Sequence, residues 1–263
     1  MKVHDSRSNA PFAQASYFRA RRRRPCAVEE LAWARWGRRA ATIPVYLTLG
    51  LVGLLSLPMT IAFAVLIDLA RGAPRLPTLR CVLGLTLYFV CEAVGIVASF
   101  VLWIAHALLP GADREHELRW NLALQSAWAR TLFAGVTRVF SMRVEITGAD
   151  SVRNGPLFLL CRHASTLDTL LPTVFVSDPR RLRLGHVMKR ELLWDPCIDI
   201  VGQRTRNAFV RRESGKREKE IALLRRMACE VTNSDGVLMF PEGTRFSRAK
   251  RARALQYLRE TGQ

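Results

Sequence analysis

The stretch of sequence that decides the fold covers Pro156–Phe175 and reads PLFLLCRHASTLDTLLPTVF. Its first part, Pro156–Cys161, is apolar and typical of a buried strand, whereas the apolar part Leu167–Phe175 predicts a helix. His163 and Asp168 stand between them. A carboxylate on one ring nitrogen of a histidine fixes the tautomer and leaves the other nitrogen free to take a proton. The junction therefore predicts a general base where a strand gives way to a helix.

The spacing of this pair also has a plainer interpretation, a loop histidine beside a helix-capping aspartate. The chain has five His and nine Asp among its 263 residues. A pair at this spacing therefore arises by chance in roughly one of six such chains. Spacing alone leaves the two interpretations about equally weighted, and a second stretch is needed to separate them.

That second stretch begins with Val237–Phe240, an apolar run that reads as a buried strand. The turn that follows, Pro241–Ser247, presents the carboxylate of Glu242 and the guanidinium of Arg245. The planar fork of an arginine suits a phosphate group. The alternative is a Pro-Gly turn with a surface ion pair. The presence of both this motif and the His163–Asp168 pair in one chain favours a shared site.

These motifs resemble those of the glycerolipid acyltransferases typified by 1-acylglycerol-3-phosphate acyltransferase. The His-x-x-x-x-Asp block of that family matches His163 and Asp168. Its Phe-Pro-Glu-Gly-Thr-Arg-Ser block matches Phe240–Arg245, after which Phe246 is inserted before Ser247.

Two further blocks of the family lie between these motifs. Lys189–Leu192 matches a Lys-x-Glu-Leu segment, and Phe209–Arg212 matches the second half of a Gly-x-x-Phe-Ile-x-Arg block. The family pattern continues with more strands and a Pro-containing block, whereas this sequence stops at Gln263. We therefore expect residues 110–263 to be an acyltransferase domain truncated at its C-terminus.

The resemblance implies transfer of an acyl group from acyl-CoA or acyl-carrier protein to the free hydroxyl of a lysophospholipid. The expected acceptor is 1-acylglycerol-3-phosphate, which gives phosphatidic acid. His163 would act as the base and Asp168 as its partner. No acyl-enzyme, cofactor or metal is expected, so Cys161 is not a nucleophile in this scheme. The acceptor would be bound by Arg212, Glu242, Gly243, Thr244 and Arg245.

The composition indicates an anionic partner. The net charge is +18, carried by 35 Arg and five Lys, which points to membrane lipid, nucleic acid or an acidic carrier protein. Nucleic acid is disfavoured because the basic runs contain no recognised binding motif. A non-catalytic membrane protein that holds anionic lipid or a partner on its basic face remains the rival hypothesis. The six Cys include no Cys-x-x-Cys pair and indicate a reducing compartment.

Residues 1–42 are polar and basic, and we expect residues 1–25 to be disordered. An uncharged run follows over Ile43–Ile67. At ~1.5 Å per residue, a helix of this length reaches across a bilayer. Pro58 should kink it. A second apolar run covers Cys81–Leu109 and is interrupted only by a glutamate and a histidine.

The two apolar runs predict a transmembrane hairpin over residues 43–109. The excess of cations in residues 1–42 over the linker between the runs places the catalytic part on the cytoplasmic face. The excess of Arg over Lys indicates a GC-rich bacterial genome, so the expected membrane is a bacterial inner membrane. Two long helices embedded in a single leaflet are the alternative topology.

The rest of the sequence predicts an α/β fold, with a helix-covered sheet that follows the transmembrane hairpin. An amphipathic helix is expected over Trp120–Phe140 and another over Lys216–Thr232. Because strands that hand over to helices gather their loops at one sheet edge, the two motifs should meet there. The expected strands are Arg143–Thr147, Pro156–Cys161, His186–Lys189, Asn207–Val210 and Val237–Phe240.

Overall fold

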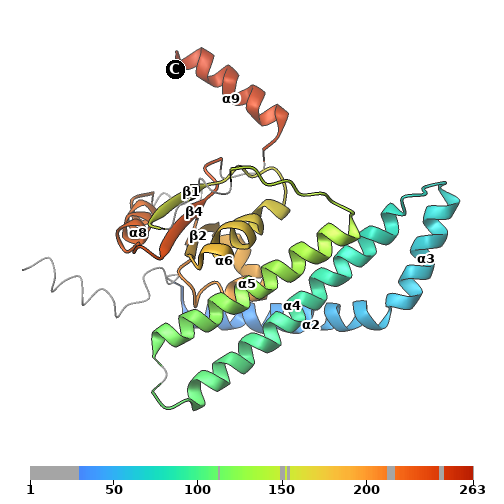
Figure 1. Cartoon of the computed structure of the whole chain (residues 1–263), viewed down its shortest axis with the longest axis horizontal. Helices are drawn as coiled ribbons and strands as arrows, with labels where there is room; N and C mark the ends of the chain where they lie inside the picture. Colours follow the sequence, from blue (N-terminus) through green and yellow to red (C-terminus); the bar gives the residue numbers. More distant parts are fainter. Residues whose placement is uncertain are drawn as a thin grey trace, which may run out of the picture.

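The structure is a computed structural model that describes residues 30–111, 113–148, 152, 155–211, 217–242 and 246–262 (Figure 1). The predicted disorder of residues 1–25 falls outside these ranges. The described residues form one parallel sheet, in which β1 and β2 both pair with β4, and β3 pairs with β2. In spatial order its strands are β1 (Leu157–Leu160), β4 (Asp235–Met239), β2 (Arg183–Lys189) and β3 (Ala208–Val210).

Helices precede the sheet, connect its strands and follow it. Three short helical turns, η2 to η4, follow β1 and β2 and cover Leu167–Thr169, Thr173–Ser177 and Arg190–Trp194. The α-helices are α2 (Ala32–Leu55), α3 (Leu57–Ala70), α4 (Pro77–Leu108), α5 (Arg114–Val139), α6 (Asp178–Arg180), α7 (Pro196–Ile200), α8 (Arg217–Cys229) and α9 (Arg248–Thr261). Figure 1 shows α9 projecting away from the rest of the molecule, and none of its residues is buried.

Apolar side chains hold helices against the sheet. Met227 of α8 is buried with Ala208 and Val237, so α8 covers one face. Leu193, in η4, is buried against Phe209 with only 1% of its surface exposed. Removing such side chains from water stabilises the fold by about 1.5–3 kcal/mol each. The predicted helix-covered sheet is therefore present, and its strands are parallel.

Two predicted elements are wrong. Residues 143–148 belong to no strand, because a strand needs a hydrogen-bonded neighbour and the described strands provide none there. The helix predicted over Leu167–Phe175 is broken into the 3-10 turn η2 and the π turn η3. Pro172 lies between these turns and lacks the N–H that a continuous helix would use.

The N-terminal helices follow the apolar pattern with shifted boundaries. α2 begins at Ala32, inside the segment predicted to be basic and partly disordered. It bends by 68° into α3 at Ser56, next to the Pro58 that predicts a kink. By length and composition, α4 is the one described helix that could cross a membrane, or one of two if the bent pair α2–α3 counts as a single span.

The middle of α4 contacts the domain that carries the sheet. The Tyr88 hydroxyl donates to Asp195 at 2.8 Å. The indole of Trp128 in α5 donates to Glu92 at 3.1 Å, and Glu92 is fully buried. The opposite face of α4 is apolar and exposed at Leu85, Val94, Val97, Phe100, Val101, Trp103, Ile104 and Leu108.

Candidate active site

The sheet brings the two sequence motifs together. β1 and β4 are parallel neighbours, with Leu160 beside Met239 in the register. The ladder continues one step further, because Cys161 N–H donates to the Met239 carbonyl at 3.0 Å. Both motifs therefore leave the sheet at the same carboxyl edge, where parallel α/β sheets hold their sites.

His163 lies at this edge with 22% of its side chain exposed. Its ring centroid is 4.8 Å from that of Phe240, the residue after β4. Nδ1 is 3.9 Å from Oδ2 of Asp168, which is an ion-pair separation and longer than a hydrogen bond. Nδ1 is buried and has no hydrogen-bond partner among the residues that the structure describes. Within the described residues, Asp168 is the carboxylate that forms an ion pair with Nδ1.

Asp168 also holds the turn that carries His163. Oδ2 accepts from the Ala164 N–H at 2.5 Å and the Ser165 N–H at 2.6 Å, while Oδ1 accepts from the Ser165 hydroxyl at 2.8 Å. Partial burial raises the pKa of Asp168, but these hydrogen bonds outweigh it, so the pKa lies below its ordinary 3.8. The turn is therefore fully stabilised above pH 3.8, and this stabilisation is lost as the pH falls through the lower folded pKa.

Glu242 contacts the turn that carries His163. Its Oε2 accepts from the backbone N–H of His163 at 2.9 Å. On the other side of the same residue, the Phe246 N–H donates to the His163 carbonyl at 2.6 Å. The second motif therefore holds the His163 backbone from both sides. The sequence motif predicts that Glu242 binds the acceptor and gives no indication of its contact with the His163 backbone.

The other predicted acceptor residues, Arg212, Gly243, Thr244 and Arg245, lie outside the described residues. The neighbours of the last three, Glu242 and Phe246, both contact His163. Arg211, next to Arg212, is exposed and donates its backbone N–H to Glu220 at 2.7 Å. Among the described residues, no group of three or more His, Cys, Asp or Glu side chains could hold a metal ion.

Cys161 lies two residues before His163, so a thiol nucleophile has to be considered. Burial and the nearby charge of Asp168 raise the pKa of the Cys161 thiol above its ordinary value. The thiolate is the nucleophilic form, and a raised pKa reduces its population at neutral pH. The surroundings of Cys161 therefore disfavour an acyl-enzyme at this position.

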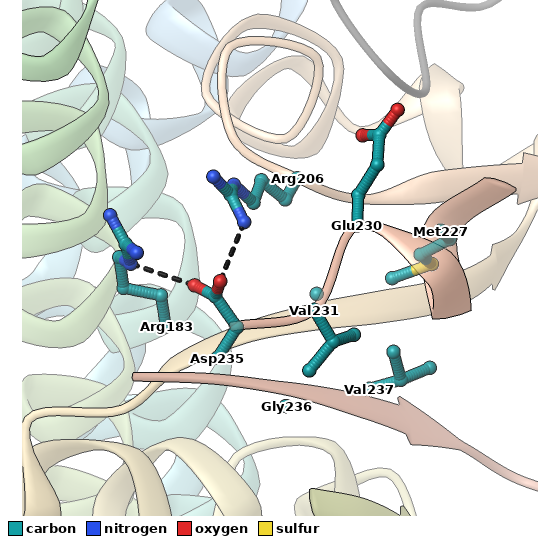
Figure 2. A pocket seen from close by; sticks show the side chains of 9 residues that line it. Arg183, Arg206, Met227, Glu230, Val231, Asp235, Gly236 and Val237 are labelled. Carbon is teal, nitrogen blue, oxygen red and sulfur yellow. Dashed lines mark hydrogen bonds and ion pairs between the residues drawn. The ribbon is translucent and has the colours of Figure 1, made fainter. Parts of the chain in front are cut away.

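A pocket lies at the amino ends of β2 and β4 (Figure 2), whereas His163 lies beyond the carboxyl edge of the sheet. Asp235 lines this pocket and accepts from Arg183 at 2.7 Å and from Arg206 at 2.8 Å. The remaining space is about 20 Å³, which is room for a single water molecule. This ion-paired cluster joins the starts of the strands and is too small for a lipid headgroup.

The bracing contact gives a testable expectation for Glu242. Glu242→Ala removes the acceptor for the His163 N–H, and we expect the rate of the reaction assisted by His163 to fall by about tenfold as the turn loosens. Glu242→Gln keeps an acceptor oxygen and should lose less. Steady-state rates of both variants, with Glu218→Ala on the exposed side of α8 as the matched control, test this. Equal rates for Glu242→Ala and wild type would contradict the bracing role.

No curated protein and no solved structure matches the chain. A protein-family model described as Acyltransferase matches residues 143–259. This family includes the glycerolipid acyltransferases, whose motifs the sequence resembles, and acyl transfer is its general chemistry. The chain therefore carries, over residues 143–259, a domain of the acyltransferase family.

Proposed function

We propose that this protein transfers an acyl group from a thioester donor to the free hydroxyl of a lysophospholipid. The observation that carries the proposal is the His163 ring beside the Asp168 carboxylate, 3.9 Å apart at the edge where both motifs leave the sheet. The motif resemblance favours 1-acylglycerol-3-phosphate as acceptor and acyl-CoA or acyl-carrier protein as donor. The product is then phosphatidic acid.

In the proposed reaction, Nε2 of His163 takes the proton of the acceptor hydroxyl as its oxygen attacks the thioester carbonyl. The carbon–sulfur bond breaks, the new ester bond forms, and the imidazolium returns its proton to the departing thiolate. Asp168 faces Nδ1 and stabilises the imidazolium in between. The acyl group never rests on the protein, which fits the raised pKa of the Cys161 thiol.

The acceptor phosphate is assigned, within the same proposal, to Arg245 and Arg212 of the family blocks. Gly243 and Thr244 would supply a close backbone approach and a hydroxyl donor. The support for this assignment is the sequence motif, together with the contacts that its neighbours Glu242 and Phe246 make with His163. A phosphate bound here would hold the glycerol hydroxyl near the base, and orientation of this kind lowers the barrier.

Asp168→Asn tests the two roles of the carboxylate separately. The amide oxygen can still accept from the backbone of the turn, whereas the negative charge beside His163 is lost. We expect the variant to fold normally and to lose about 10²–10³-fold in rate. Circular dichroism measures folding, and a thiol-release assay measures the rate. Asp168→Ala, which removes both the charge and the hydrogen-bond acceptor, should fold poorly and be inactive. A fully active Asp168→Asn protein would contradict the proposed base.

We propose further that α2, α3 and α4 hold the protein on the membrane by lying along one leaflet. A helix that crosses a bilayer has its middle in the hydrocarbon layer, about 15 Å from either surface. The middle of α4 instead contacts polar groups of the catalytic domain, since Tyr88 bonds to Asp195 and Arg204 donates to the Ser99 carbonyl at 3.0 Å. These contacts favour the single-leaflet topology over the transmembrane hairpin, with the exposed apolar face of α4 in the lipid.

Labelling of the turn between α3 and α4 distinguishes these topologies. Arg75 is exposed in this turn, and a cysteine is introduced there in a background that lacks Cys26, Cys81 and Cys229. In the single-leaflet arrangement, we expect Arg75→Cys to react with an impermeant maleimide from the same side as Arg119→Cys in α5. Reaction of the two cysteines from opposite sides would instead establish the hairpin.

A further inference from the structure

Arg162, the residue between Cys161 and the proposed base, is held in place by two partners. The carbon at the centre of its guanidinium lies 3.8 Å from the ring centroid of Phe246. Its Nε is 3.5 Å from Oε1 of Glu242. A guanidinium stacked on an aromatic face and paired at one nitrogen has a fixed plane and a fixed direction. Arg162 is therefore oriented, although 62% of its side chain is exposed.

The terminal edge of this guanidinium remains available. Within the described part of the chain, the two partners of Arg162 occupy its face and its Nε. Its two terminal nitrogens can still donate in parallel, in the fork geometry that matches the oxygens of a phosphate. Glu242 pairs with Nε of Arg162, so this ion pair leaves the donors on the two terminal nitrogens unused.

The same contacts tie Arg162 to the catalytic turn. Phe246 supplies the ring under Arg162 and also donates its backbone N–H to His163. Glu242 pairs with Arg162 and accepts from His163. Phe246 is also the residue inserted into the family block before Ser247. The stack thus depends on a feature by which this chain departs from the family pattern.

We propose that Arg162, stacked on Phe246, is a phosphate-binding side chain that determines substrate specificity at this site. This inference rests on the proposed acyl-transfer function and adds a phosphate contact supplied by the base turn itself. The phosphate would belong to the lysophospholipid acceptor or to the CoA part of the donor. Because the fork is attached next to His163, a phosphate bound there lies close to the reacting hydroxyl or thioester.

The test compares Arg162→Lys, which keeps the charge but loses the fork and the stack, with wild type. Arg119→Lys, at an exposed position of α5, is the matched control. Kinetic constants are measured with an acceptor that bears phosphate, lysophosphatidic acid, and with one that lacks it, monoacylglycerol. Donors are acyl-CoA and an acyl thioester of N-acetylcysteamine, which has no phosphate. Phe246→Leu, which keeps an apolar side chain but removes the flat ring, is tested in parallel.

We expect Arg162→Lys to raise the KM of one phosphate-bearing substrate by about tenfold and to leave kcat unchanged. The KM of the matching substrate without phosphate should not change. Phe246→Leu should act in the same direction by about threefold. A rise in KM for lysophosphatidic acid alone shows that Arg162 binds the acceptor phosphate. A rise for acyl-CoA alone shows that Arg162 binds a phosphate of the donor. A loss that is equal for all substrates, or no loss, overturns the proposal.

A binding measurement separates failure of this inference from failure of the proposed function. Lysophosphatidic acid and monoacylglycerol are titrated into the protein in neutral detergent, without any acyl donor. One outcome is that the wild type shows no transfer with any substrate while Arg162→Lys still weakens the binding of lysophosphatidic acid and not of monoacylglycerol. That result would support the phosphate site and contradict the proposed reaction. CoA without an acyl group is titrated in the same way, and unchanged binding of both lysophosphatidic acid and CoA in both variants overturns the phosphate site even when the wild type is an active transferase.

Discussion

His163→Ala is expected to reduce acyl transfer by about 10²–10⁴-fold, the usual contribution of a positioned general base. The alanine leaves a space beside Phe240 and removes the only ring nitrogen near Asp168 among the described residues. The Asp168 hydrogen bonds to Ala164 and Ser165 do not involve the ring. The fold should therefore survive, and the loss should appear in kcat.

The matched control for this variant is His116→Ala. His116 lies in α5, pairs with the exposed Asp113 at 2.7 Å, and belongs to no part of the proposed site. Rates for both variants are measured by thiol release from the donor in the presence of lysophosphatidic acid. Wild-type activity in His163→Ala would remove the catalytic role of this residue, whereas an equal loss in both variants would indicate a folding defect.

The second large effect concerns Asp199, which joins the N-terminal helices to the catalytic domain. This residue of α7 is fully buried. Its carboxylate accepts from Arg38 at 2.7 Å and from Arg39 at 2.8 Å, both in α2, and from the Gln203 amide. Asp199 is thus the counter-charge for two arginines that are mostly buried.

Asp199→Ala leaves the mostly buried Arg39 without its carboxylate partner, whereas Arg38 keeps Glu30 at 2.8 Å. Breaking a buried ion pair from one side costs about 3–5 kcal/mol, and partial exposure of the arginines places our expectation near the lower value. For a chain of this size, that corresponds to a fall in Tm of roughly 6–12 °C. Thermal unfolding in mild detergent measures it, with Glu260→Ala on the exposed helix α9 as control. A Tm within a degree of wild type would show that this network does not hold α2 to the domain.

The sequence was sufficient where one local pattern decides the outcome. The apolar runs before His163 and before Pro241 predict strands, and because parallel strands share a carboxyl edge, the meeting of the two motifs follows. β1 and β4 confirm both strands. The hydropathy of residues 81–109 likewise predicts the long helix α4.

The sequence was insufficient where contacts between distant residues decide. Polar and apolar residues alternate over 143–147, as in a strand. A strand forms only beside a partner strand, however, and the alternation does not identify one. The start of α2 in the basic segment depends on the bonds of Arg38 and Arg39 to Asp199, about 160 positions away. The bracing role of Glu242 depends on a backbone N–H, which no motif encodes. The insertion of Phe246 was the one visible sign of its contact with Arg162.

The contacts of α4 also connect membrane attachment to the catalytic domain. α4 meets the domain through the hydroxyl of Tyr88 and the buried carboxylate of Glu92, and it presents apolar side chains on the opposite face. An apolar face of this kind favours the membrane boundary. In the proposed arrangement, the domain lies close to the surface from which a lysophospholipid acceptor would come, and no separate carrier for the acceptor is required.

The most direct test of the central claim follows a labelled acyl chain through one turnover of the wild-type protein. Labelled acyl-CoA is mixed with excess protein and lysophosphatidic acid, and the label is divided among donor, protein, free acid and lipid product. Direct attack assisted by His163 predicts that the label passes to phosphatidic acid with none bound to the protein, and that it stays on the donor when the acceptor is omitted. Label held on the protein as a thioester at Cys161, or label that stays on the donor with both substrates present, would contradict the account.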